Sequence, residues 1–152
     1  MRISQNFTLA ELTTTSTGLA NTPDPVQLSR LSALCADLLE PVRALLGVPL
    51  RVNSGFRSAE VNRAVRGSAT SAHCSGDAAD IVALGIPSEV AMREIARAYA
   101  AGKLPRLDQC ILYASGMIHI GQPRGSQRPR GDLLRSAAPS GAGGPYSAFI
   151  LR

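Results

Sequence analysis

Residues 71–80 read SAHCSGDAAD and contain one of the chain's two histidines, His73, with Asp80 closing the segment. The second histidine, His119, lies far downstream in the segment GMIHIG. A catalytic zinc site takes about three ligands from His, Asp or Glu side chains and keeps one position open for water. These three side chains can form such a site if the fold brings them together. The alternative is that His119 is an exposed histidine, or one whose hydrogen bonds are made within the fold, and that Asp80 caps a strand.

The residues around this segment predict how the three groups could meet. The loop between His73 and Asp80 contains small residues that let the chain fold tightly around a metal. The run ADIVAL predicts a buried strand, while LDQCILY and MIHIG predict two strands joined by an Ala-Ser-Gly turn. Alternation in MIHIG puts His119 on the face opposite Ile118 and Ile120. If the isoleucines face the core, His119 faces a cleft.

Two helix starts precede this region. Thr8 with Glu11, and Asp24 with Gln27, have the spacing of capping boxes. The second box opens a long helix with an apolar stripe from Leu28 to Leu46 at helical spacing, which predicts core packing. We expect this helix to bend or slip at its internal proline, which lacks a backbone donor, and to end at a glycine.

Together these elements predict an α+β fold, with helices first and a small antiparallel sheet after them. At 152 residues the chain is expected to form a single domain, 1–152. Residues 122–152 are rich in Pro, Gly and Arg and read as a C-terminal extension, in which the final SAFIL could add an edge strand. The segment PSEVAMREIARAYAA predicts another helix. No apolar stretch of the sequence approaches the length of a membrane span.

The composition limits the class of partner. The net charge is +5, with 45% hydrophobic and 18% charged residues, which favours an anionic partner such as a bacterial envelope or nucleic acid. Basic and aromatic residues are not interleaved as in single-strand binders, so nucleic acid is the weaker reading. The N-terminal segment lacks the apolar run of a classical export signal. The expected location is therefore the cytoplasm, the medium after lysis, or an assembled particle such as a virion.

Three widely spaced cysteines do not predict a disulfide framework. Cys35 and Cys110 fall within apolar patterns and are interpreted as small core residues. Cys74 lies beside His73 and is a weaker candidate for a soft metal ligand.

The segment SGFRSAEVNRAVRGSATSAHCSGDAADI, residues 54–81, resembles a known family motif. It is similar to the zinc D-alanyl-D-alanine carboxypeptidase family, which includes L-alanyl-D-glutamate endopeptidases of phage endolysins and shares the hedgehog-type zinc fold. That pattern runs S-G-[FY]-R-S, then N-x-x-V-x-G, then S-x-H-x-x-G-x-A-x-D-[IV]. The resemblance covers roughly residues 5–121. The matching residues are Ser54, Gly55, Phe56, Arg57, Ser58, Asn62, Val65, Gly67, Ser71, His73, Gly76, Ala78, Asp80 and Ile81.

This resemblance implies that His73, Asp80 and His119 bind Zn²⁺ and that the substrate is a peptidoglycan stem peptide, cut by a carboxypeptidase or an endopeptidase. Arg57 would point into the cleft and pair with a substrate carboxylate or carbonyl, a role suited to a fixed guanidinium group. The alternative for Arg57 is a structural salt bridge. Ser71 would help to hold the loop or the substrate.

One feature departs from the family pattern. The family usually has an acidic residue just ahead of the second histidine, and here Tyr113 stands where a Glu is common. A tyrosine can donate a proton or a hydrogen bond, but it is a poor base near neutral pH. Asp77 and Asp108 are the nearby carboxylates. Asp108 is interpreted as structural, and Asp77 falls at a position that the family leaves variable.

Two classes of function therefore stay open. One is a peptidoglycan peptidase whose base comes from elsewhere in the chain. The other is a catalytically weak or inactive zinc-fold module that binds cell wall, or that builds a phage particle or a homo-oligomer.

Overall fold

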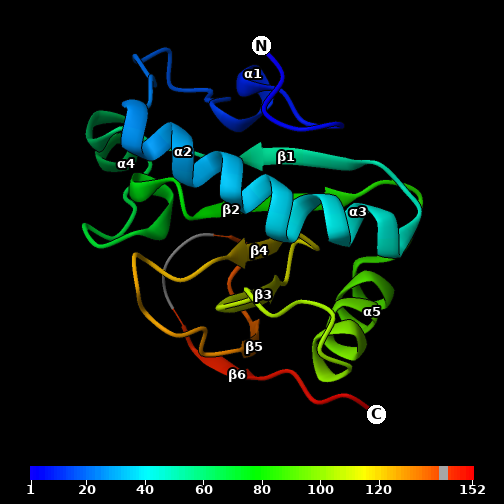
Figure 1. The fold of residues 1–152 in the computed structure, drawn as a ribbon. Helices are drawn as coiled ribbons and strands as arrows, with labels where there is room; N and C mark the ends of the chain where they lie inside the picture. The colour runs from blue at the N-terminus through cyan, green and yellow to red at the C-terminus, as the bar shows by residue number, and fades with distance from the viewer. Residues whose placement is uncertain (141–143) are drawn as a thin grey trace.

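The chain begins with helices and ends in strands (Figure 1). The structure, a computed structural model, describes residues 1–140 and 144–152 and has the predicted α+β architecture. The helical segments are α1 (Leu9–Leu12), α2 (Pro25–Leu34), the π-helical segment η1 (Cys35–Leu39), α3 (Glu40–Leu46), α4 (Ala59–Ala64), the 3₁₀ segment η2 (Ala72–Ser75) and α5 (Ser88–Ala100). The strands are β1 (Leu50–Ser54), β2 (Ala78–Ala83), β3 (Gln109–Tyr113), β4 (Ile118–Gly121), β5 (Asp132–Ser136) and β6 (Tyr146–Ala148).

The sheet has six strands in the order β1-β2-β4-β3-β5-β6. Its first four strands pair antiparallel, as the sequence predicts. The extension adds the last two strands, and β5 pairs parallel to β3, so the complete sheet is mixed and larger than expected. In β5 the sequence DLLRS has only two adjacent apolar residues, Leu133 and Leu134, and no alternation of apolar and polar residues, so the sequence does not indicate a strand there. The extension does end in an edge strand, β6, but its bounds differ from the expected SAFIL segment: it shares only Ser147 and Ala148 with that segment, and residues 149–151 lie outside the strand.

The long helix starts and slips as predicted. Asp24 accepts a hydrogen bond from the backbone of Gln27, whose side chain accepts one from the Asp24 backbone, which completes the capping box. The helix continues through η1, where the Glu40 amide donates to the Cys35 carbonyl, and resumes as α3. Because Pro41 has no amide proton, the helix loses one ordinary bond there, and the π-type turn directly precedes it.

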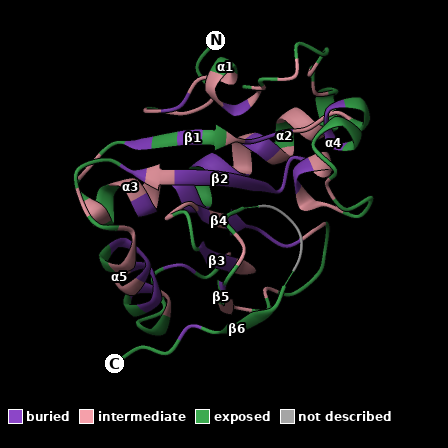
Figure 2. Ribbon diagram, turned by 180° about the vertical axis from the view of Figure 1, so that it is seen from behind, coloured by how far each residue is buried: buried purple, intermediate pink, exposed green. Residues whose placement is uncertain are grey.

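The core lies between the helices and one face of the sheet. Figure 1 shows α2 and α3 crossing in front of β1 and β2, with α5 beside them. Figure 2 shows buried residues concentrated in β2, β3 and β4, while β6 is exposed. Residues on the helix stripe that are fully buried in this core are Leu31, Leu34, Cys35, Leu38, Leu39 and Val42.

The strands supply the sheet side of the core. Ile81, Ile118 and Ile120 are fully buried within it. Side chains that alternate with them along β2 and β4 therefore lie on the other face of the sheet. No helix within the described part of the chain has the length and apolar character needed to cross a bilayer.

Candidate metal centre

Three side chains from two neighbouring strands and one short helical turn converge on the face of the sheet away from the core. Asp80 in β2 and His119 in β4 are direct partners across the antiparallel ladder. His73 comes from η2, the turn that leads into β2. Ligand atoms of all three residues lie within 4.8 Å of one another, and among the described residues they form the group able to hold a metal ion. The structure therefore brings together the three predicted ligands.

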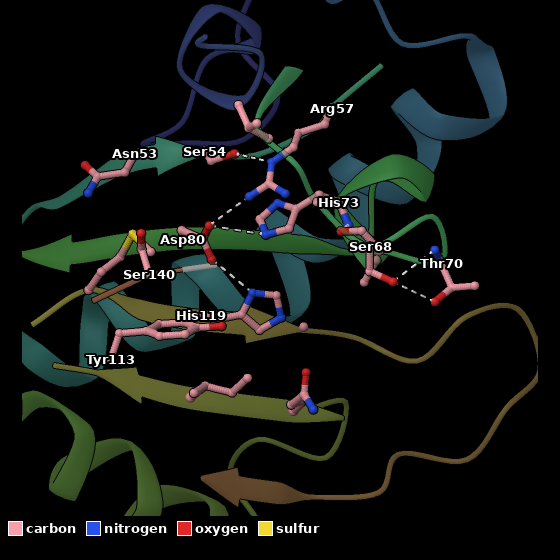
Figure 3. A pocket seen from close by; sticks show the side chains of 18 of the residues that line it. Asn53, Ser54, Arg57, Ser68, Thr70, His73, Asp80, Tyr113, His119 and Ser140 are labelled. Carbon is pink, nitrogen blue, oxygen red and sulfur yellow. Dashed lines mark hydrogen bonds and ion pairs between the residues drawn. The ribbon is translucent and has the colours of Figure 1, made fainter. Parts of the chain in front are cut away.

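The contacts within this trio are close. His73 Nε2 lies 3.3 Å from Asp80 Oδ2, and His119 Nδ1 lies 2.9 Å from Asp80 Oδ1. The two imidazole rings meet edge to face, with their centroids 5.1 Å apart. Figure 3 shows Asp80 between the two histidines, with both rings turned toward its carboxylate. This is the arrangement expected of side chains that share one cation.

The protonation of His73 tests whether a cation fits. His73 Nδ1 lies 2.7 Å from the carbonyl oxygen of Gly55, and a carbonyl can only accept, so Nδ1 carries the proton. Burial lowers the pKa of His73, although the charge of Asp80 opposes this, so the ring favours its neutral form. Its unprotonated Nε2 then faces a carboxylate oxygen. Two acceptors at this distance repel each other unless a cation lies between them, so the donor set fits a metal ion.

Asp80 is held ionised. Burial alone would raise the pKa of Asp80, but its polar neighbours, among them the hydrogen bond from His119, outweigh burial and hold the pKa well below its usual range. Two imidazoles and one carboxylate suit zinc, which accepts nitrogen and oxygen ligands. A backbone hydrogen bond that orients a ligating imidazole, as Gly55 does for His73, is also typical of metal sites.

Arg57 lies beside the trio. Its Nη2 is 3.3 Å from Asp80 Oδ2, and its Nε donates to Ser54 Oγ at 3.0 Å. Asn62 accepts a longer hydrogen bond of 3.5 Å from Nη1. Arg57 thus lines the pocket and also pairs with a carboxylate of the fold. Its position is compatible with both interpretations, a substrate-binding residue and a structural salt bridge. Its role in binding substrate stays a prediction.

Ser71 caps the turn that carries His73. Its Oγ accepts a hydrogen bond of 3.3 Å from the His73 amide. This contact supports the part of the prediction in which Ser71 holds the loop. Ser71 also lines the pocket, so contact with substrate stays open as its second role.

The trio lies in a pocket of about 690 Å³. In Figure 3, Ser68 and Thr70 lie on the His73 side of Asp80, whereas Tyr113 and Ser140 lie on the opposite side. Tyr146 of β6 also lines this pocket. Ser140 and Tyr146 belong to the Pro/Gly/Arg-rich extension and carry no sequence signal that would assign them to the site.

The family model described as Peptidase M15 matches residues 5–121 of the chain. The chain belongs to the Peptidase M15 family. This confirms the family resemblance, over the span expected from the motif, and the fold agrees with it. A search of the curated proteins gave no match. An M15 chain with a candidate metal site is a candidate metallopeptidase with a peptide substrate.

The carboxylates near this M15 site are tied to arginines. Asp77 is fully buried and receives hydrogen bonds from Arg30 of 2.8–3.0 Å, and it does not line the pocket. Asp108 lines the pocket but pairs with Arg130 at 2.7 Å. Among the described residues, the pocket's carboxylates are thus Asp80 and Asp108. Asp77 therefore has a structural role. The carboxylate of Asp108 is not free, because Arg130 binds it.

Tyr113, which stands where the family resemblance leads us to expect an acid, lines the pocket. It is buried, and burial raises the pKa of Tyr113, with further increases from Tyr146 and from the charge of Asp80. A phenol with a raised pKa can donate a hydrogen bond but does not accept a proton near neutral pH.

Cys74 lies outside the metal-capable group, while Cys35 and Cys110 are buried free thiols, as their apolar surroundings predict.

Proposed function

We propose that the protein is a zinc-dependent peptidase that cuts peptidoglycan stem peptides, as a carboxypeptidase or an endopeptidase. The observation that carries the proposal is the convergence of His73, Asp80 and His119 at one pocket of an M15 chain. Bound zinc would supply Lewis-acid polarisation of the scissile carbonyl.

The chain's own side chains would position the substrate around that centre. Arg57 is fixed by Ser54 and Asn62 and has its guanidinium in the pocket, so it can bind a substrate carboxylate or carbonyl with little loss of side-chain freedom. Tyr113, on the opposite wall, can donate a hydrogen bond to an oxygen that gains negative charge during the reaction. Neither residue removes a proton from water at neutral pH.

The experiment is digestion of purified peptidoglycan by the zinc-loaded protein, with the released muropeptides separated by chromatography. We expect slow release of stem-peptide fragments that stops when a chelator removes the metal. Arg57→Ala should lower kcat/KM by about tenfold or more while thermal stability changes little. Arg51→Ala, in an exposed part of β1, is the control and should change neither quantity. An equal loss of stability and activity in Arg57→Ala would assign Arg57 to the fold instead.

The second candidate function is a catalytically weak or inactive module that binds cell wall or builds a phage particle or homo-oligomer. It is favoured by the lack of a free carboxylate among the described lining residues, since loss of a general base costs about two to four orders of magnitude in rate. Tyr113→Glu decides between the two. Turnover that rises in this variant, while Tyr113→Phe gives no rise, means that the base was missing. Turnover in the wild type at the level of ordinary wall peptidases, with none gained in Tyr113→Glu, means that a base exists elsewhere.

A further inference from the structure

The charges that line the pocket do not balance. Four arginines and two aspartates line it: Arg57, Arg66, Arg124 and Arg130, and Asp80 and Asp108. Each aspartate has its own arginine, because Asp80 pairs with Arg57 and Asp108 with Arg130. Arg66 and Arg124 make no ion pair with any acidic residue in the described part of the chain. The pocket therefore has two positive charges that no carboxylate of the described residues neutralises, in addition to any metal charge.

The backbone of Arg66 is unusual. Its φ is 57°, and no other non-glycine among the described residues has a positive φ. Arg66 follows the end of α4, where Gly67 N donates to Asn62 O at 2.9 Å and Arg66 N donates to Arg63 O at 3.1 Å. This is the turn at which helices commonly place glycine, because a side chain in the left-handed region is strained. Strain of this kind persists where the side chain has a use, and here the side chain is exposed at the pocket.

Arg124 reaches the same end of the pocket from a different part of the chain. It follows β4, and its Nη2 donates a hydrogen bond to the carbonyl of Thr70. Ser68 and Thr70, in the loop that follows Arg66 and that Arg124 contacts, also line the pocket. Figure 3 shows these two residues beside His73 and away from Tyr113. One end of the pocket is thus basic and lined by hydroxyls, while the other carries Tyr113 and Ser140.

We propose that Arg66 and Arg124 form a second carboxylate-binding subsite, separate from Arg57, which selects peptides that carry an internal carboxylate on the His73 side of the scissile bond. This inference rests on the proposed peptidase function and specifies its substrate class. A guanidinium group binds a carboxylate through two parallel hydrogen bonds, and two such groups at one end of a pocket favour an acidic residue over its amide. Ser68 and Thr70 add neutral donors at the same place.

The test uses stem tetrapeptides with all carboxylates free and counterparts in which one internal carboxylate at a time is amidated. We expect the wild type to cut one free-carboxylate peptide about tenfold better in kcat/KM than its amide. Arg66→Gln and Arg124→Gln should each lower this preference about threefold, and together they should abolish it, because cleavage of the free-carboxylate peptide falls to the level of its amide. Arg63→Gln removes the same charge from an exposed site on α4 outside the pocket and should leave the preference unchanged.

Arg66→Gly adds a readout that a structural role would not produce. Glycine relieves the strain at φ 57°, so this variant should unfold at a higher temperature and still lose about threefold of the preference. A preference that survives in the double variant, or a wild type that cuts acid and amide peptides equally well, would overturn the subsite and leave the peptidase function intact.

If the wild type cuts none of these peptides, the peptidase function fails and calorimetric titration of the zinc-loaded protein with the same peptides tests the subsite alone. Tighter binding of one free-carboxylate peptide than of its amide, lost in the double variant and kept in Arg63→Gln, supports it. Equal affinities for all acid–amide pairs refute it.

Discussion

Replacing Asp77 with asparagine separates a structural carboxylate from a catalytic one. Asp77 lies in the metal loop, between His73 and Asp80, where a displaced general base could be sought. In the structure its carboxylate is fully buried and accepts two hydrogen bonds from Arg30 Nε, at 2.9 and 3.0 Å, and one from Nη2 at 2.8 Å. Gln122 donates a further bond of 3.1 Å, and Ser75 donates another. The side chain thus joins the metal loop to α2.

The expected cost follows from these contacts. Removing one partner of a buried ion pair costs about 3–5 kcal/mol, because the other charge stays buried. Arg30 keeps 26% of its side chain exposed, so water recovers part of its solvation, and asparagine keeps one acceptor oxygen. We therefore expect Asp77→Asn to lower the free energy of unfolding by about 2–4 kcal/mol. For a chain of 152 residues this corresponds to a fall in Tm of about 5–15 °C.

The assay is thermal unfolding followed by circular dichroism, with kcat measured well below the lower Tm. Asp77→Asn should lose stability while the folded protein keeps its zinc and its turnover. Asp37→Asn, an exposed aspartate without an ion pair among the described residues, should change the free energy of unfolding by no more than about 0.5 kcal/mol. An Asp77→Asn protein with unchanged Tm and kcat reduced by orders of magnitude would refute this reasoning and identify Asp77 as the base.

Three further changes test other parts of the structure. Protein purified without chelator should hold about one equivalent of zinc, and His119→Ala should lose most of it on dialysis, as measured by metal analysis; full retention would exclude this ligand. Gly67→Ala should lower the free energy of unfolding by about 1–3 kcal/mol in denaturant titrations, because a Cβ would lie 2.0 Å from Asn62 Oδ1; no change would mean that the loop yields freely. Burial raises the pKa of Glu40, but hydrogen bonds led by Asn6 outweigh it and lower the pKa, so the stabilisation exists above the unfolded-state pKa and is lost as pH falls. Glu40→Gln should therefore be less stable than wild type at pH 7 and equally stable in acid, and a constant difference across pH would contradict this.

The metal centre could be predicted because its signals are local. His73 and Asp80 belong to one long motif, and the alternation around His119 assigns that side chain to a face of its strand. The slip of the long helix could likewise be predicted from Pro41 alone, because the missing donor is a property of one residue.

Contacts between distant segments could not be predicted in the same way. Arg30 and Asp77 are 47 residues apart, and neither has a neighbour that marks it as half of a buried pair. The parallel pairing of β5 with β3 depends on how the extension crosses the sheet. Arg66 carries no signal in sequence, since its role emerges only from its positive φ and from the pocket it lines.

The wall formed by Ser140 and Tyr146 has a consequence for how such proteins can diverge. All three candidate ligands lie within residues 5–121, the part that the family shares, whereas this wall comes from 122–152. The metal ligands and this part of the pocket wall are therefore encoded in separate stretches of one gene. Substitutions or length changes in the tail can reshape what enters the pocket while the ligands keep their positions. Two chains with identical metal loops can then prefer different peptides, and exchanging their tails should exchange that preference.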